Sequence, residues 1–244
     1  MRNILCTLRF DGTPFCGYQV QKNGVTIAEK VQDAIEAVTG IRSDIKGCSR
    51  TDAKVHANMY CLNFHTASGI PCDKLIRALN MHLPYEIAVY DCREVADDFH
   101  ARYHCKGKEY MYLIHNHLCR QPFLQNLAYE YRYSIDTDQL NQAGKAFIGT
   151  HDFKSFCSVK ADVEDTTRTV SGFGVFREGE MVKIYVAGDG FLFNMVRIMV
   201  GTLLWISQGR LKPDAIPDIL AARDRSQAGV TAPAHGLYLN KVLY

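Results

Sequence analysis

The chain has 244 residues, and its 28 lysines and arginines against 26 aspartates and glutamates give a net charge of +2. That length is sufficient for one large domain or two small ones, and the near-neutral charge excludes a protein that binds nucleic acid through its overall charge alone. The proportions of hydrophobic residues, 47%, and charged residues, 22%, exclude a disordered, collagenous or coiled-coil chain.

The first half of the chain is predicted to follow the order β-α-β-β-α-β. Thr26 and Glu29 form a capping box at the start of an amphipathic helix that ends at Gly40. A second helix begins near Pro71 and stops at Pro84, because proline fits the first turn of a helix but not its interior. The expected strands are 5–10, 45–50, 56–66 and 87–95.

The second half repeats this order with insertions. Its expected elements are a strand at 108–115, a helix from Asp136, a hairpin of 169–176 and 181–187, an apolar helix at 192–207, a shorter helix from Pro213 and a strand at 237–243. Two such repeats predict an α+β fold of two ferredoxin-like units, whose antiparallel sheets flank a central active-site cleft. We expect the units to span residues 1–104 and 105–244.

The sequence predicts a cytoplasmic protein without a membrane span. The first apolar run is too short for a signal peptide, and the strongest one, 191–206, contains Asn194 and Arg197 and falls short of the roughly 18–20 residues that a spanning helix needs. The nine cysteines include no Cys-x-x-Cys pair, so we expect reduced thiols.

Two histidine pairs have spacings compatible with a metal site, His100 with His104 and His115 with His117. The neighbouring sequence contains no cluster of carboxylates or cysteines to complete such a site. We therefore expect no metal.

Asp52 lies in the connection between the second and third expected strands, near Arg50, Lys54 and His56. Cationic neighbours would keep its carboxylate ionised, so that it could act as a nucleophile or a base. The alternative is a turn stabilised by an aspartate side chain, with the basic residues simply solvated.

Arg197 is surrounded by apolar residues in the 192–207 helix. A buried guanidinium needs a carboxylate partner, for which Asp52 and Asp189 are the candidates. The alternative is an arginine that reaches solvent along its aliphatic stem.

Tyr110 and Tyr112 share one face of an expected strand and lie beside Arg102, Lys106 and Lys108 in the sequence. Aromatic rings beside cations are typical of a surface on which RNA bases stack. Tyrosine is also common in strands for packing reasons alone, and that alternative stays open.

Taken together, these segments resemble the TruA family of tRNA pseudouridine synthases over nearly the whole chain. The central motif is Ser49-Arg50-Thr51-Asp52-Ala53-Lys54-Val55-His56-Ala57, where the family has Gly-Arg-Thr-Asp-Ala-Gly-Val-His-Ala. The other matching segments, in order, are 15–19, 108–112, 151–156, 167–168, 194–197 and 231–239. Three residues depart from the family pattern: Ser49 and Lys54 replace glycines, and Tyr18 replaces a tryptophan. Since glycine permits backbone conformations that other residues resist, a differently shaped loop is expected.

The resemblance implies an isomerase that converts uridine to pseudouridine without cofactor or metal. It implies that Asp52 is the catalytic nucleophile, that Arg197 is its ion-pair partner and that Tyr110 stacks on the target base. It further implies that Leu237 packs against the same base and that Arg50 assists its extrusion from the stem. Lys54 adds a charge that can contact the RNA.

The resemblance also implies a homodimer acting on tRNA, at positions 38, 39 and 40 just 3′ of the anticodon. A related enzyme that modifies a different RNA site and a non-catalytic RNA-binding module are the alternatives. An enzyme acting on a small molecule, or a structural protein, is a more distant one.

Overall fold

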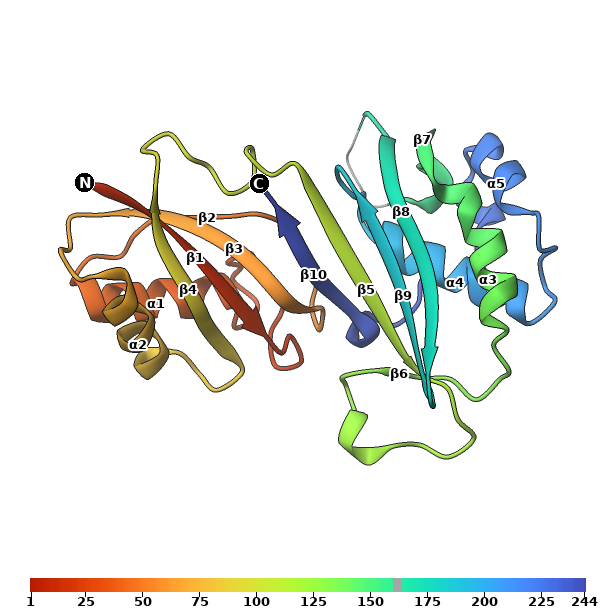
Figure 1. The fold of residues 1–244 in the computed structure, drawn as a ribbon, viewed down its shortest axis with the longest axis horizontal. Coiled ribbons are helices and arrows are strands. Elements are labelled where there is room, and N and C mark those ends of the chain that lie inside the picture. The colour runs from red at the N-terminus through yellow and green to blue at the C-terminus, as the bar shows by residue number, and fades with distance from the viewer. Residues whose placement is uncertain (160–163) are drawn as a thin grey trace. The chain divides into compact units, whose positions relative to one another are not determined.

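The computed structural model describes residues 1–159 and 164–244 and has the predicted α+β fold. The chain forms two compact units, which are described separately (Figure 1). The first unit contains Met1–Lys106 and Tyr238–Tyr244, and the second unit contains Gly107–Leu237.

The first unit contains the predicted β-α-β-β-α-β order and one further strand. Its elements are β1 (Arg2–Phe10), α1 (Ile27–Thr39), β2 (Ile45–Gly47), β3 (His56–Thr66), α2 (Cys72–His82), β4 (Ile87–Val95) and β10 (Leu237–Leu243). The strands are ordered β4-β1-β3-β10, and β2 also pairs with β3. The antiparallel pairs β1–β3 and β1–β4 form the ferredoxin-like core, and α1 packs against α2.

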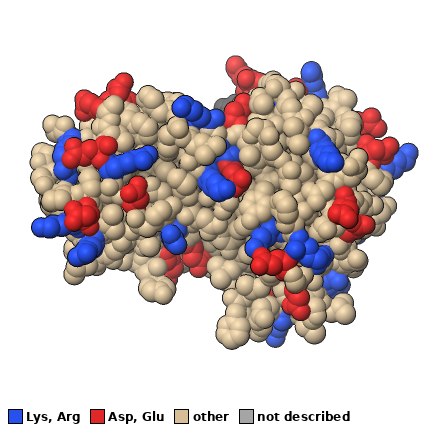
Figure 2. Space-filling model, in the orientation of Figure 1, with Lys and Arg blue, Asp and Glu red and all other residues tan. Residues whose placement is uncertain are grey.

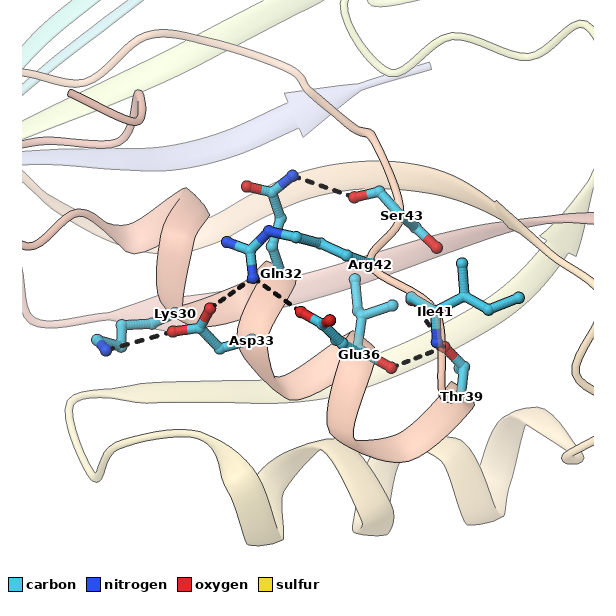
Figure 3. A network of polar contacts seen from close by, with 9 residues as sticks. Lys30, Gln32, Asp33, Glu36, Thr39, Ile41, Arg42 and Ser43 are labelled. Carbon is cyan, nitrogen blue, oxygen red and sulfur yellow. Dashed lines mark hydrogen bonds and ion pairs between the residues drawn. The ribbon is translucent and has the colours of Figure 1, made fainter. Parts of the chain in front are cut away.

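Helix α1 begins and ends where the sequence predicts. The Thr26 hydroxyl accepts the backbone N–H of Glu29, and Gly40 ends the helix in the left-handed conformation. Arg42 then binds back to the helix, because its Nη1 lies 2.7 Å from Asp33 Oδ1 and 3.0 Å from Glu36 Oε2 (Figure 3). These side chains are partly exposed, so the network adds little stability, but it ties the end of α1 to the segment that leads into β2.

The C-terminal strand differs from the expected domain organisation, which placed it in the second unit. Strand β10 pairs in parallel with β3, with Tyr238 opposite His56, and residues 238–244 belong to the first unit. The Tyr244 hydroxyl donates to the Ala101 carbonyl at 2.8 Å, which fixes the end of the strand. A strand's hydrophobic period identifies its buried face but not its neighbour, and this neighbour lies about 180 positions earlier in the chain.

In the second unit, the described residues form the other sheet strands and three α-helices. Its elements are β5 (Gly107–His115), β6 (Tyr129–Glu130), α3 (Thr137–Gly144), β7 (Gly149–Asp152), β8 (Thr167–Glu178), β9 (Met181–Gly188), α4 (Met195–Ser207) and α5 (Ile216–Ala222). The strands are ordered β5-β9-β8-β7, and the short β6 pairs with β5. The predicted hairpin is confirmed as β8–β9, with Gly179 at positive φ in its turn.

Helix α4 is buried along most of its length. At Gly201 the helix closely approaches the backbone of Val230, since a Cβ on Gly201 would lie 1.7 Å from the Val230 carbonyl oxygen. Among the described residues no helix is long and apolar enough to cross a membrane.

Residues 116–134 form a segment that leaves the end of β5 and returns through β6. His115, at the end of β5, ties this segment to the rest of the unit, because its Nδ1 lies 2.7 Å from Glu130 Oε2 in β6 and its Nε2 lies 3.1 Å from Glu180 Oε2 in the β8–β9 turn. Burial alone would lower the pKa of His115, but the hydrogen bonds to the two glutamates outweigh it and the pKa is raised.

We expect His115→Gln to lower the free energy of unfolding by up to about 1 kcal/mol, since both glutamates are partly exposed. A raised pKa in the folded state stabilises the protein below the unfolded-state pKa of about 6.5, and this contribution is lost as the pH rises through the folded-state pKa. Urea denaturation at pH 6, 7.5 and 9 measures the difference, with the exposed His82→Gln as control. A difference that stays constant over this range would contradict the assignment.

Candidate functional site

The loop that carries Asp52, residues 48–55, is hydrogen-bonded to its own unit at several points. Cys48 N–H donates to the Cys61 carbonyl at 2.9 Å, and the Tyr60 hydroxyl donates to the Ser49 carbonyl. Tyr18 N–H donates to the Thr51 carbonyl at 3.0 Å. Asp52 is half-buried. The backbone on both sides of the carboxylate is therefore held by β3 and by the segment after β1.

Two glycines allow the backbone after β1 to contact this loop. A Cβ on Gly17 would lie 2.7 Å from the Thr51 carbonyl oxygen, and a Cβ on Gly12 would lie 2.0 Å from the Val55 carbonyl oxygen. Gly17 also has a φ of +95°, which side chains rarely adopt. Glycine is thus required at these positions both by the close approach and, at Gly17, by the backbone conformation.

Tyr18, which stands where the family has tryptophan, is a packing residue beneath the loop. Its ring is buried and stacks on Tyr60, with 4.5 Å between the ring centroids. Burial raises the pKa of Tyr18, so the phenol stays neutral. The replacement keeps a buried aromatic side chain packed on Tyr60.

Lys54 has a φ of +66° and an exposed side chain. It therefore adopts the left-handed conformation that glycine, its counterpart in the family motif, reaches without strain. Ser49 replaces the other glycine without a positive φ. The loop thus accepts both replacements, with backbone strain at Lys54.

His56 lies in the scaffold beneath the loop and is not one of the solvated cations around Asp52. Its side chain is 1% exposed, its ring stacks on Tyr238, and its Nδ1 accepts the Gly12 N–H at 3.0 Å. Arg50 and Lys54, by contrast, are exposed. The sequence could not distinguish the buried His56 from the exposed Arg50 and Lys54. The burial of His56 follows from its position at the start of β3, where its side chain faces the interior.

In the second unit, Arg197 lies in the first turn of α4 and is half-buried. Its Nε donates to the Ala232 carbonyl at 2.7 Å, and its Nη1 donates to Asn194 Oδ1 at 2.6 Å. Two hydrogen bonds to separate segments fix the plane of the guanidinium. Asp189, one of the two expected partners, uses Oδ1 to accept the Thr169 N–H at 3.0 Å.

Tyr110 and Tyr112 do not form a two-ring surface for stacking. Tyr112 is completely buried, and its hydroxyl donates to the Pro233 carbonyl at 2.7 Å. Tyr110 is 7% exposed and contacts Phe191 edge to face, with 5.1 Å between the ring centroids. Of these two rings, only that of Tyr110 is accessible to a ligand. Leu237, at the start of β10, is also 7% exposed.

Two residues of the second unit were given no role at the site from the sequence. Phe191 packs on Tyr110, and Asn194 orients Arg197 from a left-handed backbone with φ of +62°. Both lie in the 190–197 segment. Their position close to an arginine in an otherwise apolar run is the sequence feature that could have identified them.

Neither unit offers a metal site within residues 1–159 and 164–244, where no three His, Cys, Asp or Glu side chains are placed to hold an ion. Lysines and arginines are interspersed with acidic residues over the face drawn in Figure 2.

We expect Lys54→Gly to raise the free energy of unfolding by about 1 kcal/mol, because it removes the left-handed strain of a residue with a side chain. Urea denaturation measures this, with Lys22→Gly as control. Lys22 is exposed but has no positive φ, so its replacement should stabilise nothing. Equal effects of the two variants would show that Lys54 is unstrained.

Residues 7–104 and 143–244 match a family model described as "tRNA pseudouridine synthase". Residues 105–142, which include Tyr110 and the 116–134 segment, lie between the two matched stretches. Among solved structures, "Crystal Structure of a Cbf5-Nop10-Gar1 Complex" aligns with 97% of this chain and 48% of that chain, at 15% identity and a TM-score of 0.42.

Curated relatives match from end to end. The chain is 44% identical to "tRNA pseudouridine synthase A" of Acetivibrio thermocellus and 45% identical to that of Caldicellulosiruptor bescii, and each alignment covers 100% of both chains. The protein of the same name from Brevibacillus brevis is 44% identical over the same coverage. The chain therefore belongs to the tRNA pseudouridine synthase family, as its motifs indicate.

Proposed function

We propose that this protein converts uridine to pseudouridine in tRNA at positions 38, 39 and 40, with Asp52 as the nucleophile and without a cofactor. The observation that carries this proposal is the hydrogen-bonded loop that holds the Asp52 backbone on the first unit's sheet. The proposal is tested against two alternatives. One is a related enzyme with a different RNA target, and the other is an RNA-binding module without catalysis.

The reaction is an isomerisation, in which the N1–C1′ bond of uridine breaks and a C5–C1′ bond forms. C5 loses its proton and N1 gains one, so the atoms balance without an added reactant. A single carboxylate suffices to divide this change into easier steps through a covalent intermediate. Asp52 supplies that carboxylate in the proposal.

The target base must leave a paired stem, which costs a few kcal/mol. We assign Arg50 to assist this extrusion and Lys54 to contact the RNA backbone, and both side chains are exposed. Tyr110 would stack on the extruded uracil while Leu237 packs against the same base. The contact with Phe191 supports this role, because it fixes the orientation of the Tyr110 ring.

Arg197 is proposed as the ion-pair partner that keeps Asp52 ionised and oriented during the reaction. Its hydrogen bonds to Ala232 and Asn194 support this, because both acceptors are neutral oxygens that orient the guanidinium without cancelling its charge. A half-buried guanidinium is stabilised by a carboxylate.

From the family resemblance we also propose that the protein works in the cytoplasm as a homodimer, with one tRNA contacting both subunits. Several adjacent uridines are accepted because such an enzyme reads the shape and backbone of the RNA more than its sequence.

Pseudouridine mapping on an unmodified tRNA pool tests the reaction, its site and the nucleophile together. We expect the wild type to modify positions 38–40, and Asp52→Asn to lower turnover by at least about 10³-fold while tRNA binding is retained. Pseudouridine only at other sites would mean that the target is wrong. Absence of product with intact tRNA binding would indicate a binding module.

Gly17→Ala tests whether the close backbone contact holds Asp52 in place. The added Cβ should displace the Thr51–Asp52 backbone and lower turnover by about 10²-fold, the loss expected from a shift of about 1 Å in a catalytic group. The matched control is Gly40→Ala, which also has a positive φ but nothing within 4 Å of its Cβ. If both variants lost stability and neither lost turnover, the contact would have only a structural role.

A further inference from the structure

The 116–134 segment contains an open pocket of about 300 Å³ at the far end of β5 from Tyr110. Tyrosines and arginines dominate its lining, with Tyr129, Tyr131 and Tyr133 on one stretch of chain and Arg120 and Arg132 beside them. The residues matched by the family model do not include this segment, although the curated relatives align across it, and the proposed reaction uses none of these side chains.

The three tyrosines form a row in which Tyr129 is half-buried, Tyr131 is buried and Tyr133 is exposed. The ring centroids are 5.8 Å apart for Tyr129–Tyr131 and 5.5 Å apart for Tyr131–Tyr133. Tyr131 is buried and its hydroxyl accepts from Gln208 at 2.9 Å, whereas Tyr133 is 51% exposed. The guanidinium of Arg132 lies 5.4 Å from the centre of the Tyr133 ring. The row therefore ends in the exposed ring of Tyr133, which lies beside the Arg132 guanidinium and packs against the buried ring of Tyr131.

The charge around this pocket is positive. Across the two described stretches of the chain, Arg120 and Arg132 make no ion pair with a carboxylate. The acidic residue in the lining, Glu130, is already engaged, because it binds His115 at 2.7 Å and accepts the Gln121 N–H at 3.2 Å. Two uncompensated guanidinium groups next to an exposed ring suit a phosphate attached to a planar base.

We infer that this pocket binds an unpaired nucleotide of the substrate RNA, whose base stacks on Tyr133 and whose phosphate contacts Arg120 and Arg132. The inference rests on the proposed function for the identity of the RNA as tRNA. Tyr110 and His115 are five residues apart on β5, about 17 Å at 3.3–3.4 Å per residue. The nucleotide in the pocket is thus a second contact and not the uridine that reacts.

A second copy of this chain is the competing occupant, because Leu118 and Phe123 of the same segment are 83% and 89% exposed. The charges favour RNA over this alternative. An apolar interface gains nothing from two arginines without carboxylate partners, and burying them would be unfavourable.

Full-length enzyme carrying Tyr133→Ala, or Arg120→Gln together with Arg132→Gln, tests the inference. We expect each variant to bind unmodified tRNA at least about fivefold more weakly, since stacking of one base contributes roughly 1–3 kcal/mol. The arginine variant should also reduce the slope of log affinity against log salt by about 1. Turnover at saturating tRNA should be unchanged. Tyr85→Ala and Arg77→Gln, exposed residues of the first unit, are the matched controls.

Unchanged tRNA affinity in both variants would overturn the inference. A change from dimer to monomer in sedimentation would overturn it in favour of an interface between copies. Failure of the proposed function is a separate result. If the wild type formed no pseudouridine but the variants still lost tRNA affinity, the pocket would stand and the reaction would not.

Discussion

The close approach of two backbone segments, one after β1 and one before β3, is the constraint on which the geometry around Asp52 depends. Gly12 and Gly17 lie so near the 51–55 backbone that a side chain at either position would overlap a carbonyl oxygen. A carboxylate on a surface loop would ordinarily sample many positions. Here the contact, together with the hydrogen bond from Tyr18 to Thr51, fixes the backbone on either side of the carboxylate.

The same constraint explains why an unfavourable residue can be tolerated at position 54. Its left-handed φ costs on the order of 1–2 kcal/mol for a residue with a side chain, and such strain persists where surrounding structure over-determines the backbone. Val55, the next residue, contacts Gly12, and its N–H binds the Asp52 carbonyl. The turn therefore keeps its shape when lysine replaces glycine, and the exchange places a cation beside Asp52 in the sequence.

Local signals in the sequence predicted local structure well. The capping box at Thr26 and the hairpin at Gly179 lie where expected, because caps and turns depend on a few adjacent residues. Properties set by distant partners were missed. The parallel pairing of β10 with β3, the burial of His56 and the complete burial of Tyr112 depend on contacts that no period or spacing encodes.

A protein with a net charge of +2 cannot bind RNA through its average field, so its affinity has to come from cations that are not paired locally. The arginines of this protein differ in whether a carboxylate pairs with them. Arg42 is neutralised by Asp33 and Glu36 on α1, whereas Arg120 and Arg132 lie beside an exposed tyrosine and a glutamate already bound to His115. His115 thus has two effects in one place. It anchors the segment, and it withdraws an acidic side chain that would otherwise repel phosphate.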